Sequence, residues 1–394
     1  MRNPPNPRTL SLAERDRRWT LLRAAMADEG IECIVTPPAS GRSPARQADA
    51  RYITSCGGEN VTLACLFPLD GDTTVLSRHA ERWRDSQEWV ADLREAGSSF
   101  GQETAKRLRE LRLRHGRVGM VGLDSDAVGY GFMQAVTERF SAIEWIDAAP
   151  LVGSLRVEKS AEEIGLLEVS AAIVDRALGR IQATARPGMF DYEVSAAALA
   201  EIFRECGEQP ERLAWASGIR PTPLPLPSHG ELRRGYVITA ELDAPYAGYR
   251  ARGAHAFALQ TCDQVYVALY GALSEYWERC IEELRVGRPL AEVEHACRAN
   301  AADLFPSASV FENVRGEIVL EGVGLGGDLP LIRSSASDAT NELLRPGWAM
   351  FLKASLHLEL SGRPYAASWG DTIVIEASGP RRLGSRPPEL TPIP

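Results

Sequence analysis

The chain has 394 residues, with 44 Lys+Arg against 53 Asp+Glu and a formal net charge of -9. This acidic balance argues against a broad surface for nucleic acid or an anionic membrane, so we expect a small molecule or peptide as partner. Seven scattered cysteines without a CxxC spacing, an N-terminus without an apolar signal segment and the lack of a membrane-length apolar run predict a soluble cytoplasmic protein.

The first part of the chain has the pattern of an α/β domain. Residues 1–11 are rich in Pro and Arg and predict a flexible arm. Ser11 followed by Glu14 resembles a capping box at the start of a helix that Gly30 ends. Further elements are predicted as strands at 31–36, 61–67, 73–76 and 118–123 and as helices at 103–114 and 128–140. Because strands alternate with helices, we predict an α/β domain over residues 12–154.

A second domain is predicted over residues 155–394. Ser160 and Glu163 form a capping box before a helix with an apolar stripe. An Arg-x-Gly step at 186–188 recurs at 285–287, each time with Glu-Val five and six residues after the glycine. Such an internal repeat predicts two pseudo-symmetric halves.

Three more helices are predicted in this domain, at 191–206, 265–284 and 290–304. The middle one carries aromatic residues at helical spacing. These are expected to pack in the core rather than to form a site: Tyr266, Tyr270, Tyr276 and Trp277.

The stretch from 213 to 259 predicts a proline-rich loop followed by a long hairpin, with a strand at 235–241, a turn at 244–249 and a returning strand at 250–259. Its Gly-x-Val-Ile step and Tyr-x-Gly-Tyr turn resemble the central hairpin of the creatinase/aminopeptidase P family (M24). The Arg-x-x-Lys-Ser-x-x-Glu-Ile stretch at 156–164 is also similar to that family. The resemblance implies an N-terminal α/β domain, an α+β pita-bread domain and a homodimer.

Metallopeptidases of this family hold two ions with two Asp, one His and two Glu. When these positions are carried over one by one, they fall on Glu241, Arg252, Glu321, Lys353 and Gly370. None is the family's ligand, and Arg cannot lose its proton to bind a cation. The resemblance therefore implies a member without catalytic metal or other cofactor. We expect the two acids and the two bases to pair, because buried charges need partners.

Two interpretations of these charges remain open from the sequence. They form either an inert salt-bridge cluster or the floor of a pocket for a small amino, amidino or carboxylated metabolite. Creatinase-like relatives without metal break C–N bonds by acid/base chemistry, so the prediction is a metal-independent hydrolase. The alternatives are a lyase or isomerase on the same fold, and a non-catalytic pseudopeptidase that binds a peptide or protein.

Candidate roles follow from this prediction. Glu321 is the expected general base, and Glu241 orients a cationic group of the substrate. His229, four residues beyond the position where creatinase-like enzymes carry a histidine, is the candidate for protonating the leaving group. The expected substrate-binding residues are Arg252, Lys353, His255, Tyr246, Tyr249 and Arg51, the last in a segment that resembles the one reaching the partner subunit's site.

Overall fold

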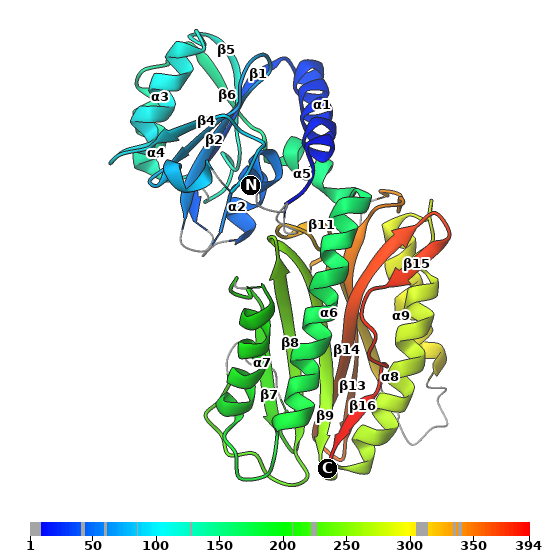
Figure 1. Ribbon diagram of the computed structural model, residues 1–394. Coiled ribbons are helices and arrows are strands. Elements are labelled where there is room, and N and C mark those ends of the chain that lie inside the picture. Colours follow the sequence, from blue (N-terminus) through cyan, green and yellow to red (C-terminus); the bar gives the residue numbers. More distant parts are fainter. Residues whose placement is uncertain are drawn as a thin grey trace. The chain divides into compact units, whose positions relative to one another are not determined.

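The structure is a computed structural model. It describes residues 9–40, 44–58, 61–84, 86–126, 128–206, 208–221, 227–304, 314–333, 336–337 and 341–394. The chain divides into two compact units, Met1–Val157 and Glu158–Pro394, which we call the N-terminal and C-terminal domains (Figure 1). No helix in these described ranges is long and apolar enough to cross a membrane.

The N-terminal domain is built on a mixed six-stranded sheet of order β4-β3-β2-β1-β5-β6. Strand β1 pairs antiparallel with β2 and parallel with β5. The strands are β1 (Ile31–Ser40), β2 (Thr62–Pro68), β3 (Thr74–Ser77), β4 (Asp92–Glu95), β5 (Gly116–Met120) and β6 (Ile143–Asp147). The predicted α/β class is confirmed, and each predicted strand overlaps an observed one.

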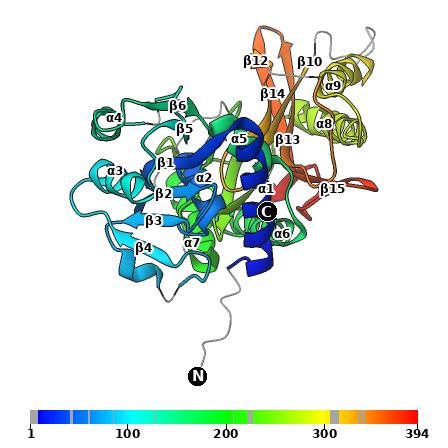
Figure 2. The same ribbon diagram turned by 90° about the horizontal axis from the view of Figure 1, so that it is seen from above.

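Helices cover both faces of this sheet. Figure 2 shows α3 and α4 on one side, where they bury apolar side chains of β1, β2 and β5. The other face packs against Ala50 of α2, with Trp19 of α1 and Trp89 beside it. The helices are α1 (Leu12–Glu29), α2 (Pro44–Thr54), α3 (Phe100–Glu110), α4 (Tyr130–Thr137) and α5 (Ala149–Val157), with a 3₁₀ turn at Ala80–Trp83.

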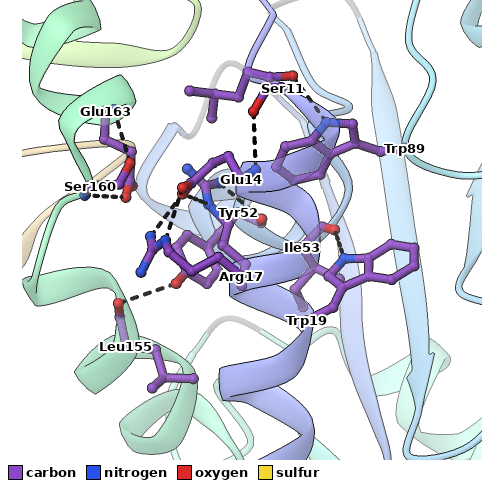
Figure 3. Close-up of polar contacts among 12 residues, drawn as sticks. Ser11, Glu14, Arg17, Trp19, Tyr52, Ile53, Trp89, Leu155, Ser160 and Glu163 are labelled. Carbon is purple, nitrogen blue, oxygen red and sulfur yellow. Dashed lines mark hydrogen bonds and ion pairs between the residues drawn. The ribbon is translucent and has the colours of Figure 1, made fainter.

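Helix α1 begins and ends where the sequence predicts. The Ser11 side chain accepts a hydrogen bond from the Glu14 backbone N–H at 3.1 Å (Figure 3). Gly30 ends the helix in the left-handed conformation. The Trp89 indole N–H donates to the Leu10 carbonyl at 3.1 Å. Residues 10 and 11 therefore belong to the helix start rather than to the predicted arm, and residues 1–8 of that arm lie outside the described residues.

A buried arginine holds the N-terminal domain together around α1. Arg18 is 1% exposed, and its Nε donates to a Glu14 carboxylate oxygen at 2.7 Å. Its guanidinium also lies 4.4 Å from the ring of Tyr52 and donates to the Tyr52 carbonyl at 3.0 Å. The Tyr52 hydroxyl reaches the Leu155 carbonyl in α5 at 3.2 Å (Figure 3). These contacts join α1, α2 and α5 on one side of the sheet.

The segment around Arg51 is helical. It forms the last turn of α2, with Tyr52 and Ile53 buried. The aliphatic part of Arg51 lies over Gly57, where an added Cβ would be 2.3 Å from the Arg51 Cγ. Contact of this segment with a partner subunit stays a prediction.

The C-terminal domain is built on a ten-stranded sheet whose main order is β12-β11-β10-β13-β14-β9-β8-β7, with β15 beside β14 and β16 beside β9. Apart from the β16–β9 pair, neighbouring strands run antiparallel. The strands are β7 (Leu213–Gly218), β8 (Val237–Tyr246), β9 (Tyr249–Leu259), β10 (Arg315–Gly322), β11 (Asp328–Arg333), β12 (Ala336–Ser337), β13 (Ala349–Leu360), β14 (Arg363–Glu376), β15 (Gly379–Arg382) and β16 (Leu390–Ile393).

The predicted hairpin is present but its turn is tighter than expected. Strand β8 continues to Tyr246 and β9 starts at Tyr249. Only Ala247 and Gly248 connect them, both with positive φ (52° and 85°). A two-residue turn of this kind matches the twist of the strands that it joins.

The two halves of this domain repeat each other, as the sequence predicts. The Gly188 N–H donates to the Leu232 carbonyl at 2.8 Å, and the Gly287 N–H donates to the Leu344 carbonyl at the same distance. Both glycines have φ near 90°, a conformation that other residues rarely adopt. The four helices of the domain are α6 (Ala161–Thr184), α7 (Asp191–Cys206), α8 (Gln264–Glu282) and α9 (Leu290–Leu304).

These four helices cover one face of the sheet (Figure 1). Ala240 and Leu242 of β8 belong to the core that α6 and α7 form with this face. The aromatic residues predicted to pack along α8 are all buried. Because side chains of a strand alternate between faces, Glu241 and Asp243 point to the opposite face, which we call the far face.

A buried ion pair fixes the glycine-rich segment that joins β10 to β11. The Lys159 Nζ lies 2.8 Å from an Asp328 carboxylate oxygen, and both side chains are 1% exposed. A Cβ added at Gly324 would lie 2.5 Å from the Asp328 carboxylate, so only glycine allows this close approach.

We predict that Asp328→Ala lowers the free energy of unfolding of the C-terminal domain by about 3–5 kcal/mol, because it leaves the Lys159 ammonium buried without its carboxylate. The double variant Lys159→Met/Asp328→Leu should recover most of the loss. Urea unfolding followed by tryptophan fluorescence measures both. Glu205→Ala, which breaks an exposed pair with Arg176, is the control and should cost under about 1 kcal/mol. Equal losses for Asp328→Ala and Glu205→Ala would contradict the prediction.

Candidate functional site

The four charged residues predicted at the family's metal positions meet on the far face. The Lys353 Nζ lies 2.6 Å from the Glu241 Oε2. The Arg252 Nη1 donates a hydrogen bond to the Glu321 Oε2 and lies 3.8 Å from the Glu241 Oε1. The four side chains are between 8% and 21% exposed. They therefore form one chain of ion pairs at a partly solvent-accessible position.

The register of the sheet explains how Glu241 and Lys353 reach each other. Glu241 pairs with Ala254, Ala254 with Gly370, and Gly370 with Lys353. These four residues thus form one row across β8, β9, β14 and β13. Since the two central residues have little or no side chain, the long side chains at the two ends can meet above them.

Three further charged residues, none of them predicted from the sequence, join this group. The Arg212 Nε donates to the Glu241 Oε1 at 2.7 Å. Asp243, 2% exposed, accepts from the backbone N–H groups of Glu211 and Arg212 at 2.9 and 3.2 Å. The Arg250 Nη1 lies 3.6 Å from Asp243. We call the whole set the charge cluster: Arg212, Glu241, Asp243, Arg250, Arg252, Glu321 and Lys353.

Two carboxyl groups of the charge cluster have shifted pKa values in opposite directions. Burial alone would raise the pKa of Glu241, but the charges of Lys353 and Arg212 outweigh it and hold the pKa below its usual value. Burial raises the pKa of Asp243, and the nearby Arg250 only partly opposes this shift. Glu241 is therefore a stable anion, whereas Asp243 takes up a proton more readily.

Comparison with known proteins agrees with this architecture. Residues 165–377 match metallopeptidase family M24, and residues 18–157 match the creatinase/prolidase N-terminal domain. The chain belongs to metallopeptidase family M24. It is 24% identical to the uncharacterized peptidase YqhT of Bacillus subtilis over 87% of this chain and 92% of that protein. It is 23% identical to the Xaa-Pro dipeptidase of Pyrococcus horikoshii over 74% of this chain and 81% of that protein.

Solved structures of M24 proteins share the fold. A dipeptidase from Pyrococcus horikoshii has a TM-score of 0.76 and 18% identity, covering 95% of this chain and 99% of that one. An Xaa-Pro dipeptidase from Bacillus anthracis has a TM-score of 0.75 and 21% identity, covering 96% and 99%. The expected combination of an N-terminal α/β domain with a pita-bread domain is confirmed.

The residues predicted at the family's metal positions do not fit a pair of divalent ions. Both Glu241 oxygens accept from cationic side chains, and the Glu321 Oε2 accepts from Arg252. A Cβ added at Gly370 would lie 2.9 Å from the Phe351 ring, from the Lys353 Cβ and from a backbone oxygen, so the fifth position is also sterically closed. Hard divalent ions need several free oxygen ligands, which this arrangement does not supply.

Within the described part of the chain, one group of three potential metal ligands lies close enough together to share an ion. It consists of His79, Glu81 and Glu95. All three side chains are exposed and lie in the N-terminal domain. An exposed group of this kind is common without a metal and does not change the interpretation of the charge cluster.

Three predicted substrate-binding residues lie on the helix-covered face instead of the far face. His255 is 2% exposed and stacks on Trp369 with ring centroids 4.8 Å apart, and burial lowers its pKa to about 3. Tyr246 packs against the core beneath α6 and α7. The Tyr249 hydroxyl donates to Glu163 of the α6 capping box at 2.8 Å. Strand alternation places these side chains away from Glu241 and Arg252.

His229 also lies outside the charge cluster. His229 is exposed, has a positive φ of 62° and contacts the ring of Tyr192 at 5.0 Å. No hydrogen bond or ion pair among the described residues joins it to the cluster. Arg51 lies in the N-terminal domain. Residues 222–226, where creatinase-like enzymes would place their histidine, lie outside the described residues.

Asp371, next to Gly370 in β14, is a buried carboxyl on the helix-covered face. Burial raises its pKa to about 7, although the Thr372 N–H and Arg382, 3.5 Å away, oppose this shift. In the unfolded chain an aspartate has a pKa near 3.8. Between these two pKa values the folded protein keeps the proton on Asp371, whereas the unfolded chain releases it. The stability of the folded state with respect to this group is therefore complete below about pH 4 and is lost as the pH rises through 7.

We predict that Asp371→Asn removes this pH dependence. The variant should gain stability relative to the wild type as the pH increases from 4 to 7, by up to about 4 kcal/mol. Urea unfolding at a series of pH values measures the difference. Parallel stability curves for the two proteins would contradict the assignment of a proton to Asp371.

Proposed function

We propose that this M24 protein is a metal-independent enzyme that hydrolyses a C–N bond of a small polar metabolite on the far face of its C-terminal sheet. The observation that supports the proposal is the chain of ion pairs from Lys353 through Glu241 and Arg252 to Glu321. These side chains stand at the positions that the sequence comparison with the family predicts for its metal ligands. A relative named Xaa-Pro dipeptidase is named for the hydrolysis of a C–N bond. The proposed reaction breaks the same type of bond but uses fixed cationic side chains instead of metal ions.

The charge cluster supplies the groups that such a reaction needs. Arg252 and Lys353, each about 20% exposed, can hold the substrate and balance negative charge that develops on it. Glu321 takes a proton from water while the water oxygen bonds to the substrate carbon. The C–N bond then breaks, and the nitrogen leaves with the proton that Glu321 returns. His229 has no role in this scheme.

One observation favours a second candidate, the non-catalytic pseudopeptidase. Both oxygens of Glu241 accept from cationic side chains, and the Glu321 Oε2 accepts from Arg252, so both carboxylates are already neutralised by fixed cations. A cluster in which charges neutralise one another can also serve only to stabilise the sheet. In that case the protein binds a peptide or protein without converting it.

We predict that the purified protein contains less than stoichiometric metal and is stabilised thermally by one class of small amino, amidino or carboxylated compounds, with or without chelator. An Xaa-Pro dipeptide belongs in the panel. Elemental analysis and thermal shift are the measurements. Stoichiometric metal together with metal-dependent peptidase activity would contradict the proposal, and a metal-free protein that no compound stabilises would favour the pseudopeptidase.

We further predict that Glu321→Gln lowers kcat for the stabilising compound at least about 100-fold while its binding persists, because general-base catalysis contributes factors of this size. Arg252→Ala should abolish both binding and turnover. Glu317→Gln is the matched control, since Glu317 lies on the same strand but pairs with His357 instead of the cluster. Equal kcat for Glu321→Gln and Glu317→Gln would exclude Glu321 as the base.

A further inference from the structure

Two arginines of the charge cluster have hydrogen-bond donors without a partner. The buried Nε atoms of Arg250 and Arg252 have no hydrogen-bond partner among the described residues. Arg250 is only 7% exposed. A buried donor that forms no hydrogen bond costs free energy, so a pair of them in one cluster requires an explanation.

Both arginines lie on the same face of β9. They are two residues apart in the strand, which places their side chains on one side of the sheet. Asp243 confirms this side, because it pairs with Arg252 in the strand register and its carboxylate lies 3.6 Å from the Arg250 Nη1. The two unpaired Nε–H groups therefore belong to one neighbourhood on the far face.

The rest of each arginine is held in place. The Arg250 backbone N–H donates to the Gly324 carbonyl at 2.9 Å, and its Nη1 donates to the Gln209 carbonyl at 3.2 Å. The Arg252 backbone N–H donates to the Thr372 hydroxyl at 2.8 Å, and its guanidinium lies 5.1 Å from the Phe351 ring. Donors fixed in this way lose little conformational entropy when an acceptor binds.

Charge balance indicates what kind of acceptor is missing. The charge cluster contains four cationic side chains and three carboxyl groups, so one positive charge is in excess. The excess grows when the buried Asp243 takes up a proton. Water could satisfy the two donors but would leave the charge uncompensated, whereas a carboxylate supplies one negative charge and two oxygens that accept N–H donors.

We propose that Arg250 and Arg252 bind a carboxylate group of the ligand on the far face. This inference rests on the proposed function for the location of the ligand and adds its chemical class, a small carboxylate. The ion pair of Arg252 with Glu321 then holds the bound molecule beside the candidate base.

The test compares N-acetylglycine with N-acetylglycinamide by isothermal titration calorimetry on the full chain at constant ionic strength. The two probes differ only in the carboxylate. We expect the acid to bind at least about tenfold more tightly than the amide, the effect of a hydrogen bond to a charged group. Equal affinities for the two probes would overturn the inference.

Conservative variants test the Nε–H donors directly. Arg252→Lys and Arg250→Lys keep the positive charge and remove the Nε–H, so each should weaken binding of the acid at least about tenfold without changing binding of the amide. Arg233→Lys, at an exposed arginine 3.9 Å from Glu231, is the matched control and should change nothing. If Arg250→Lys does not fold, the partly exposed Arg252→Lys decides, and unchanged affinity for the acid in that variant overturns the inference.

Further outcomes separate this inference from the proposed function. Arginine-dependent binding of the acid without turnover of any compound supports the carboxylate site and contradicts the hydrolase. Turnover of a neutral amide that needs neither arginine supports the hydrolase and overturns the carboxylate site. Phosphate that binds as tightly as the acid, with the same dependence on the arginines, would show a general oxyanion site and overturn the assignment to a carboxylate.

Discussion

The C-terminal domain depends on the neutralisation of charge where its two halves meet. Glu241 belongs to the first half and Lys353 to the second, and the contact between them crosses the pseudo-symmetric sheet. The pair formed by Arg252 and Glu321 crosses from β9 to β10 in the same way. The side chains of the two halves supply both signs of charge, so these charges neutralise one another directly.

A site built from arginine, lysine and glutamate performs different chemistry from a site that holds divalent ions. A divalent ion lowers the pKa of bound water and polarises a carbonyl group. Arginine and lysine can stabilise negative charge, but neither generates hydroxide at neutral pH. A carboxylate must then act as the base, and Glu241 is unsuited to this because Lys353 and Arg212 hold its pKa low. Among the carboxylates of the charge cluster, the ion pairs of Glu241 therefore favour Glu321 as the candidate base.

The sequence was sufficient for the fold and for the centre of the site, because both are encoded by local patterns. Capping at Ser160 and the repeated Arg-x-Gly steps define the helices and the two halves, and motif spacing identifies Glu241 and Lys353. Arg212 and Asp243 were missed because their contacts depend on how the segment before β7 lies against β8, which no local pattern encodes.

The incorrect assignments have a common physical reason. Tyr246 and Tyr249 flank the hairpin turn, and proximity to the turn suggested a pocket wall. The turn contains only two residues, so both tyrosines belong to the strands and alternate onto the helix-covered face. In each case the boundary of an element, rather than its presence, decided where the side chain points.

The glycine-rich segment after β10 links the stability of the domain to the geometry of the site. A glycine of this segment allows a close approach to the buried ion pair. Gly324 approaches the buried pair of Lys159 and Asp328, and its carbonyl accepts the backbone N–H of Arg250. A larger residue at 324 would collide with Asp328 and displace this acceptor. Because Arg250 and Arg252 lie two residues apart on β9, the hydrogen bond to Gly324 helps to fix the backbone from which both arginine side chains extend.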